Sequence, residues 1–367
     1  MELNSTLAWL VDSAAQTPTP ELFLASLGSR LIKDGTPLAG GALTLTSPHP
    51  LIARRTWLWR AESNVVIEAL SFAAGAHSTM AGSAGEEAGR RWLAEVVAGP
   101  LHEDVVGLTT DGPRLGWIGP HAFTPDEADR LREAARFAAA PLAALSARAT
   151  LTAALEAYLG RRSAARVLAS PLRRGMGETI EAALLLADLR GFTDMSESAA
   201  PSAVISALDA WFDRIAGSVH AFGGEVLKFM GDGVLAIFPV SGASPRNACD
   251  AALKAVDAAR AGMALLDEAR EREGLTPLPF GVALHLGEVL WGNIGAADRL
   301  DFTAIGPAVN LVSRLEGLCR PLDRAVLVSG AFAAETTAPL IPLGTHALRG
   351  IAAPCAVFTV AAEPHSR

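Results

Sequence analysis

The chain has 367 residues, of which 50% are hydrophobic, and its 31 Lys and Arg residues against 39 Asp and Glu residues give a formal net charge of −8. This length is sufficient for two domains that each bury a hydrophobic core. Because nucleic-acid backbones attract clustered positive charge, the acidic balance argues against a general nucleic-acid-binding protein, although it allows an anionic ligand at a local site.

The cysteines and the apolar segments argue against two further classes of protein. Cys249, Cys319 and Cys355 are far apart and form no Cys-x-x-Cys pair, which disfavours a disulfide framework or a zinc site and is typical of the reducing cytoplasm. The longest apolar runs, such as residues 182–187, are too short to span a bilayer. The N-terminal apolar stretch has no basic residues before it, so we expect neither a signal peptide nor a membrane partner.

Residues 1–123 combine helical and strand patterns. Thr19-Pro20-Glu21 predicts the start of a helix that continues to Leu31. Together with the strands, this helix predicts a small α+β domain. The strand patterns cover residues 42–46, 56–60, 65–70, 105–108 and 114–118.

Residues 124–177 are predicted to be mainly helical. Thr124 as N-cap, Pro125 at the first helical position and acidic residues in the first turn form a helix start. Apolar residues then recur at helical intervals as far as Val167. Two interpretations stay open: a linker helix that pairs with its copy in a dimer, or an ordinary helix that caps a domain.

Residues 178–367 are predicted to form a further domain, in which strands alternate with helices. The order of these elements and their hairpins predict a ferredoxin-like α+β sheet with helices on one face. Helices are expected along residues 204–219 and 247–273 and from Pro307, and strands over residues 182–189, 226–230, 234–238, 281–286, 289–294, 325–328 and 356–360.

Two acidic residues of this domain are candidate metal ligands. Asp188 ends a predicted strand, and Asp232 lies at the tip of a predicted hairpin. Two such carboxylates can jointly hold two Mg²⁺ ions, because Mg²⁺ prefers oxygen ligands and retains substrate phosphates in its coordination shell. Such ions can activate a hydroxyl and stabilise a leaving phosphate. The alternatives are that Asp188 caps a helix and that Asp232 serves only the turn.

Polar and flexible residues nearby are candidates for contacts with a nucleotide. Gly191-Phe192-Thr193 forms a strand-to-helix turn, where backbone N–H groups can hold a phosphate. Lys228 lies on a predicted strand in an apolar neighbourhood, which indicates either a role in reading a base or an edge-strand charge that aids solubility.

Asn310 and Arg314 are four residues apart and therefore share one face of the predicted helix. Arg can contact a phosphoryl group and Asn can orient a sugar oxygen. A solvated helix face is the alternative interpretation.

Four segments that contain these residues resemble, in order and spacing, the class III adenylyl/guanylyl cyclase catalytic domain. The resemblance covers about half of the chain. The segments are LADLRGFT at 186–193, GGEVLKFMGDGVLAIF at 223–238, HLGEVLWGNIG at 285–295 and DFTAIGPAVNLVSRLE at 301–316.

The resemblance implies a homodimer that converts ATP into 3′,5′-cyclic AMP and pyrophosphate, by attack of the ribose 3′-OH on the α-phosphate. Asp188 and Asp232 are then the ligands of two Mg²⁺ ions per site, for which we expect Mn²⁺ to substitute. The resemblance also implies that each site lies at the dimer interface, with the acids from one chain and the other site residues from its partner.

The resemblance assigns the remaining residues to the nucleotide. Lys228 and Thr303 are expected to read the base, and Asn310 and Arg314 to act on the ribose and the α-phosphate. Arg349, in Leu-Arg-Gly, matches a position where the family often has a basic residue for the triphosphate.

The base preference follows from hydrogen-bonding chemistry. Lys only donates and therefore suits the adenine N1 acceptor, while Thr accepts from the N6 amine. Thr303 occurs in a subgroup similar to the bicarbonate-responsive cyclases, and because Thr also donates, selection against GTP is expected to be looser. A guanylyl or relaxed-specificity cyclase, or a nucleotide-binding module without turnover, stays an alternative.

The strand and helix order of residues 1–123, followed by the helical link into Tyr158-Leu-Gly-Arg-Arg-Ser, resembles the GAF-like sensor domains that precede some bacterial cyclases. This resemblance implies a regulatory domain with a small ligand whose identity is not readable from the sequence.

Overall fold

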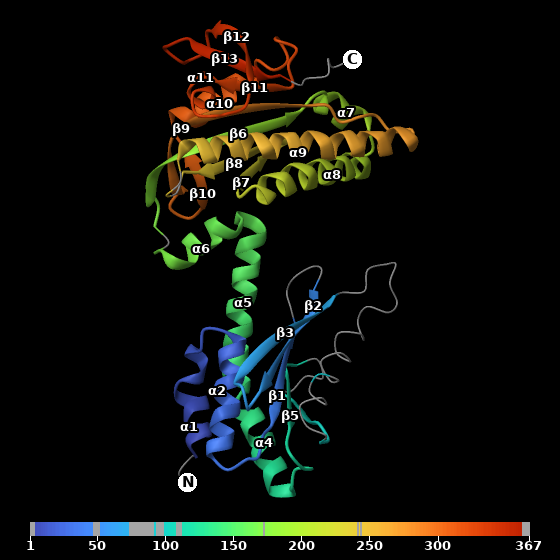
Figure 1. Ribbon diagram of the computed structural model, residues 1–367, viewed down its shortest axis with the longest axis vertical. Helices are drawn as coiled ribbons and strands as arrows, with labels where there is room; N and C mark the ends of the chain where they lie inside the picture. The colour runs from blue at the N-terminus through green and yellow to red at the C-terminus, as the bar shows by residue number, and fades with distance from the viewer. Residues whose placement is uncertain are drawn as a thin grey trace. The chain divides into compact units, whose positions relative to one another are not determined.

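The computed structural model describes residues 4–46, 52–72, 92, 99–107, 112–171, 173–240, 242 and 244–361 (Figure 1). The chain divides into two compact units, Met1–Ala154 and Leu155–Arg367. The residues predicted as a linker, 124–177, are therefore divided between the two units.

The first unit is built on a five-stranded antiparallel sheet with the strand order β3-β2-β1-β5-β4. Local side chains fix the helix starts, since Asn4 accepts a hydrogen bond from the backbone of Leu7, and Thr124 and Glu127 form a reciprocal capping box. The strands are β1 (Gly40–Thr46), β2 (Ile52–Arg60), β3 (Val65–Phe72), β4 (His102–Val105) and β5 (Arg114–Ile118), and the helices are α1 (Ser5–Asp12), η1 (Ala14–Gln16), α2 (Pro20–Lys33) and α4 (Pro125–Phe137).

The core of this unit lies between the sheet and the helices α1, α2 and α4. Trp59 and Trp117 meet edge to face there, with ring centroids 6.5 Å apart. One strand differs from expectation: β4 ends at Val105, where a strand over residues 105–108 was predicted, and Leu108 lies outside the described residues. The resemblance of residues 1–123 to a GAF-like domain stays a prediction.

The helical pattern that follows is broken into three helices: α4, α5 (Ala139–Leu159) and α6 (Arg161–Ala169). Gly160, with φ of +82°, ends α5 in a conformation that favours glycine. In the described part of the chain, no single helix is long and apolar enough to cross a membrane. The pair of α4 and α5, which meet at a bend of 45°, passes that test of length and composition only when the two are taken together.

The second unit contains an eight-stranded sheet with the order β12-β13-β11-β9-β6-β8-β7, and β10 pairs with β9 off this path. β9 is a single strand of 16 residues, although two strands were predicted. The strands are β6 (Gly177–Leu189), β7 (Glu225–Met230), β8 (Gly233–Pro239), β9 (Phe280–Gly295), β10 (Leu300–Ile305), β11 (Val326–Ser329), β12 (Leu340–His346) and β13 (Cys355–Val360), and the helices are α7 (Phe192–Ser198), α8 (Pro201–Ala221), α9 (Pro245–Arg272), α10 (Pro307–Glu316) and α11 (Gly330–Ala333).

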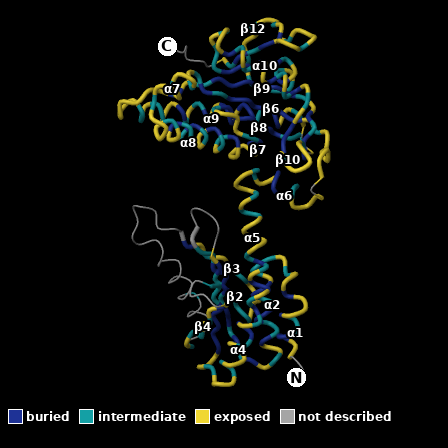
Figure 2. Tube along the Cα trace, turned by 180° about the vertical axis from the view of Figure 1, so that it is seen from behind, coloured by how far each residue is buried: buried dark blue, intermediate teal, exposed yellow. Residues whose placement is uncertain are grey.

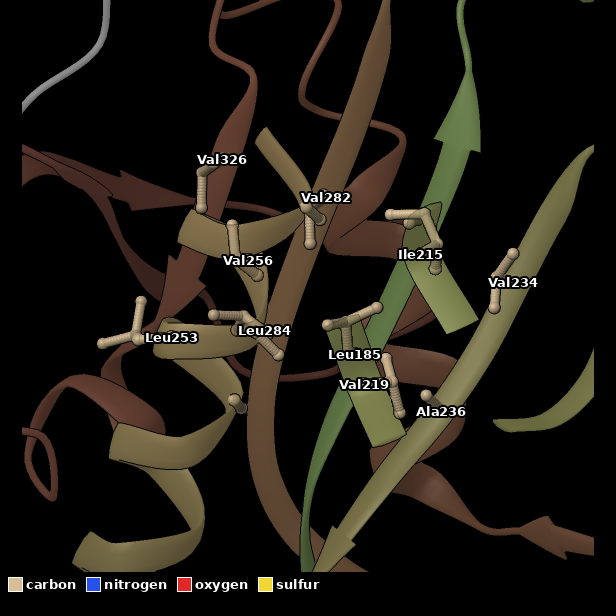
Figure 3. Close-up of a cluster of buried hydrophobic side chains, with 14 of the residues drawn as sticks. Leu185, Ile215, Val219, Val234, Ala236, Leu253, Val256, Val282, Leu284 and Val326 are labelled. Atoms are coloured by element: carbon tan, nitrogen blue, oxygen red, sulfur yellow. The ribbon is translucent and has the colours of Figure 1, made fainter. Parts of the chain in front are cut away.

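The two faces of this sheet bury different residues of β6, because side chains alternate along a strand. Leu185 and its odd-numbered neighbours pack against α8 and α9, as Figure 3 shows for Ile215 and Val256. Leu184 and its even-numbered neighbours pack on the other face with α10 and β10. Figure 2 shows the central strands between these layers as buried. The prediction of helices on one face was therefore wrong, since α10 covers the second face.

Candidate active site

Asp188 is the penultimate residue of β6, the strand at the centre of the second sheet. It pairs with Gly281 on β9, and a Cβ added at Gly233 on β8 would lie 3.3 Å from its Oδ1 atom. Gly233 therefore leaves space beside this carboxylate, while a Cβ at Gly281 would lie 3.0 Å from Oε1 of Glu316.

Asp232 lies in the tight turn between β7 and β8, where Gly231 has φ of +67°. The buried indole of Trp211 on α8 donates a hydrogen bond of 2.9 Å from Nε1 to the backbone carbonyl of Asp232. The turn is thus fixed from the helix layer, and the two aspartates, 44 residues apart in sequence, form one group that we call the acid pair.

The electrostatic surroundings of the acid pair are unfavourable to its full ionisation. Burial, repulsion from Asp232 and a hydrogen bond with Asp232 raise the pKa of Asp188 from 3.8 to about 7, with a further contribution from Glu316. Burial also raises the pKa of Glu316, which the charge of Arg190 opposes. Sequence reasoning gave Glu316 no role, because the contact between α10 and the end of β6 leaves no local pattern.

The donor set of the acid pair fits divalent metal ions. Two carboxylates held together, with no ion pair to a cation among the described side chains, form the kind of oxygen-rich, negatively charged group that Mg²⁺ and Mn²⁺ bind. Within the described ranges, no group of three or more His, Cys, Asp and Glu side chains is arranged to hold a metal ion. The acid pair would therefore need further ligands from water or substrate phosphates, as Mg²⁺ sites commonly do.

A second group, which we call the lysine cluster, consists of Lys228, Asp301 and Thr303. Lys228 on β7 forms an ion pair with Asp301 on β10, with 2.6 Å between Nζ and Oδ2. Asp301 and Thr303 are two residues apart on β10 and so lie on the same face of that strand. Sequence reasoning had given Asp301 no role.

The hydroxyl of Thr303 is an orphaned polar group. Thr303 is 4% exposed, and its Oγ1 atom is buried without a hydrogen-bond partner. Buried hydroxyl groups are normally hydrogen-bonded, so this atom marks a position that suits a polar ligand. The strands β7 and β10, which carry the predicted site residues Lys228 and Thr303, do not pair with each other, but the Lys228–Asp301 ion pair links them.

Asn310 and Arg314 lie on α10, which buries Ala308, Val312 and Leu315 against the sheet. Both side chains are exposed, as expected of residues four positions apart on the outer face of a helix. They are accessible to a ligand or to a second chain.

The phosphate loop and Arg349 complete the predicted set. Gly191 has φ of +74° and precedes α7, while Phe192 is half-buried and Thr193 is exposed. Arg349 is exposed in the turn between β12 and β13, at the opposite end of the strand order from β7. Contacts of these residues with a triphosphate stay predictions.

Comparisons with known proteins match the part of the chain that contains most of these residues. The family model of the adenylate and guanylate cyclase catalytic domain matches residues 176–334. Adenylate cyclase 1 of Rhizobium meliloti is 32% identical over 172 residues, which are 46% of this chain and 26% of that protein. The adenylate cyclase of Anabaena cylindrica is 28% identical over 169 residues, which are 45% of this chain and 32% of that protein. The chain therefore spans about a quarter to a third of the length of these relatives.

The fold has a counterpart among solved structures. The structure of a bacterial light-regulated adenylyl cyclase covers 71% of this chain and 86% of its own, with a TM-score of 0.52 and 21% sequence identity. This likeness supports the fold of the chain.

Proposed function

We propose, from the premise that residues 176–334 form an adenylate and guanylate cyclase catalytic domain, that this protein is an adenylate cyclase. It converts ATP into 3′,5′-cyclic AMP and pyrophosphate. The observation that carries the proposal is the acid pair, whose two carboxylates lie together inside residues 176–334 without an ion pair to any described cation.

The lysine cluster supports ATP as the substrate. The ammonium of Lys228 donates to adenine N1, and the free Oγ1 of Thr303 accepts from the N6 amine. Asp301 holds the flexible Lys228 side chain in place by the ion pair of 2.6 Å. Guanine would present a donor at N1 to the lysine, and a buried unmatched donor costs about 1–3 kcal/mol.

The reaction is an in-line attack of the ribose 3′-OH on the α-phosphate. Arg314 neutralises charge that develops on the α-phosphate, and Asn310 orients the ribose. Divalent ions held by Asp188 and Asp232 would supply Lewis-acid activation of the hydroxyl and neutralisation of the triphosphate. Gly191, Phe192 and Thr193 face the phosphates with backbone N–H groups, and Arg349 provides a further positive charge.

The proposed assembly is a homodimer in which one chain supplies the acid pair and its partner supplies the lysine cluster, Asn310 and Arg314. Two exposed apolar side chains on β7 next to the lysine cluster support it, since Phe229 is 51% and Met230 is 45% exposed. The first unit regulates the reaction, with a small ligand as its proposed signal.

A guanylyl or relaxed-specificity cyclase is the second candidate, because the hydroxyl of Thr303 can also donate. Turnover of ATP and GTP by the purified chain, with Mg²⁺ or Mn²⁺ and beside an Asp232→Ala variant, decides between them. Cyclic AMP from ATP that is lost in the variant supports the proposal. Preference for GTP, or equal product from the variant, contradicts it.

A further inference from the structure

Glu225 is a buried carboxylate that the proposed reaction does not use. It is the first residue of β7 and is 3% exposed. Its Oε1 atom accepts hydrogen bonds from the backbone N–H of Ser163, at 2.8 Å, and from the Ser163 hydroxyl. Its Oε2 atom is buried without a partner. Burial of a carboxylate with one oxygen unpaired is costly, which points to a role beyond packing.

The carboxylate caps the N-terminus of α6 from another part of the chain. Ser163 is the third residue of α6, and the N-cap residue Gly160 has no side chain that could accept from the free N–H groups. A Cβ at Gly160 would lie 3.1 Å from Oε1 of Glu225, so the glycine provides the space for the carboxylate. A negative charge at this position is favoured by the helix dipole.

The same helix is attached to two more strands. The guanidinium of Arg166 lies 4.2 Å from the ring centroid of Trp291 on β9 and forms an ion pair of 2.6 Å with Glu178 on β6. Trp291 in turn contacts Phe302, the residue before Thr303, with ring centroids 5.7 Å apart. α6 therefore contacts β7, β6 and β9, and Figure 1 shows it next to the end of the sheet where β7 and β10 lie.

β7 is irregular between Glu225 and Lys228. Its register with β8 shifts between Val226 and Lys228, so the ladder is interrupted one residue after the cap. A strand with such a bulge bends locally and is positioned less firmly by its neighbour. The start of β7 is held by its pairing with β8 and by the contact of Glu225 with α6, and the position of Lys228 depends on both.

We propose that Glu225 is a positioning residue through which α6 sets the place of Lys228 and thereby the affinity for the nucleotide. This inference rests on the proposed function of Lys228. α6 follows α5 in the chain after Gly160, and α5 begins in the first unit. The chain therefore connects the first unit, through α5, directly to the N-terminus of α6 that Glu225 caps.

The test compares Ser163→Ala, Glu225→Gln and the double variant in the full chain. Each single variant is expected to raise the KM for ATP by roughly 3- to 10-fold, the effect of one charge-assisted hydrogen bond, with kcat changed by less than about twofold. The double variant should show less than the sum of the single effects, since one change removes the Ser163 hydroxyl donor and the other the negative charge of its acceptor. Ser218→Ala, which removes a hydroxyl bonded within α8, is the matched control with unchanged KM.

If the folded variants keep the wild-type KM and show only a lower unfolding midpoint, the proposal is overturned. Glu225 then only stabilises the N-terminus of α6. If Glu225→Gln does not fold, Ser163→Ala alone decides. Affinity for a fluorescent ATP analogue is measured in parallel. If the wild-type chain binds the analogue but does not turn over ATP, the proposed function is contradicted. The change in analogue affinity caused by Ser163→Ala then still tests whether the contact between Ser163 and Glu225 affects nucleotide binding.

Discussion

The acid pair and the lysine cluster belong to the same domain and differ in how their charges are balanced. Two charged neighbours shift the pKa of Asp188, and both of them, Asp232 and Glu316, are acidic. Lys228, in contrast, has an opposite charge 2.6 Å away. Among the described residues, nothing balances the charge of the acid pair, so a bound cation would stabilise it. The lysine cluster is already balanced and can hold its geometry before the nucleotide binds.

The largest effect is expected at the acid pair. Asp188→Asn should lower kcat/KM by about 10³-fold, because it removes a ligand of the metal ions that stabilise the transition state. The same change should not lower the metal-free stability at pH 7, since it removes a repelled charge. Guanidinium unfolding with a chelator checks this, and a clear loss of stability would contradict the electrostatic account.

At the lysine cluster, Lys228→Ala should raise the KM for ATP and reduce the ratio of ATP to GTP turnover by about 10- to 100-fold. The reason is that a base-specific donor is lost while the metal site is intact. Steady-state kinetics with both nucleotides measure the ratio. An unchanged ratio would mean that Lys228 does not read the base and serves only as a surface charge.

Asp301→Asn tests whether the ion pair positions Lys228, because it removes the charged partner of Lys228 and leaves the groups proposed to contact the nucleotide unchanged. The expected change is a KM for ATP raised by about 3- to 10-fold, in keeping with the modest energy of a partly exposed ion pair. Asp301→Glu should recover most of the affinity. If the asparagine variant binds ATP as well as the wild type, the ion pair has no positioning role.

The pH dependence of stability separates the two groups further. The folded state raises the pKa of Asp188 from 3.8 to about 7, so between these values the native state binds more protons than the unfolded state. The free energy of unfolding contributed by this group therefore falls as pH rises through that window. Unfolding of the metal-free chain at pH 5 and pH 7 should show this slope, and Asp188→Asn should reduce it. Equal slopes in both proteins would contradict the assignment.

The sequence predicted the elements whose signals are local. A continuous run of apolar residues identified the central strand around Leu185, and Thr124 with Pro125 marked the start of α4, where the structure shows a capping box. β9 was predicted as two strands, over residues 281–286 and 289–294, with Gly287 between them. In the structure a Cβ at Gly287 would lie 2.8 Å from Cβ of Ala308, so this glycine allows α10 to approach the strand.

Contacts between segments that are distant in the sequence could not be predicted from local patterns. The pairs Lys228–Asp301 and Ser163–Glu225 are separated by 73 and 62 residues, and each depends on strand pairing that a single sequence does not reveal. The residues of the candidate site could be predicted because they lie in four sequence segments whose order and spacing resemble a known family. The partners that position those residues became visible only in the folded chain.

Complementation between two inactive variants tests most directly the claim that the two groups act together across a dimer. Asp232→Ala and Arg314→Ala are each expected to lose about 10²- to 10³-fold or more in rate when assayed alone. Mixed in equal amounts under conditions of subunit exchange, they should recover about a quarter of the wild-type rate, since half of the dimers then contain one intact site of two. Recovery at that level supports a site shared between chains. No recovery, despite demonstrated exchange of subunits, would contradict it.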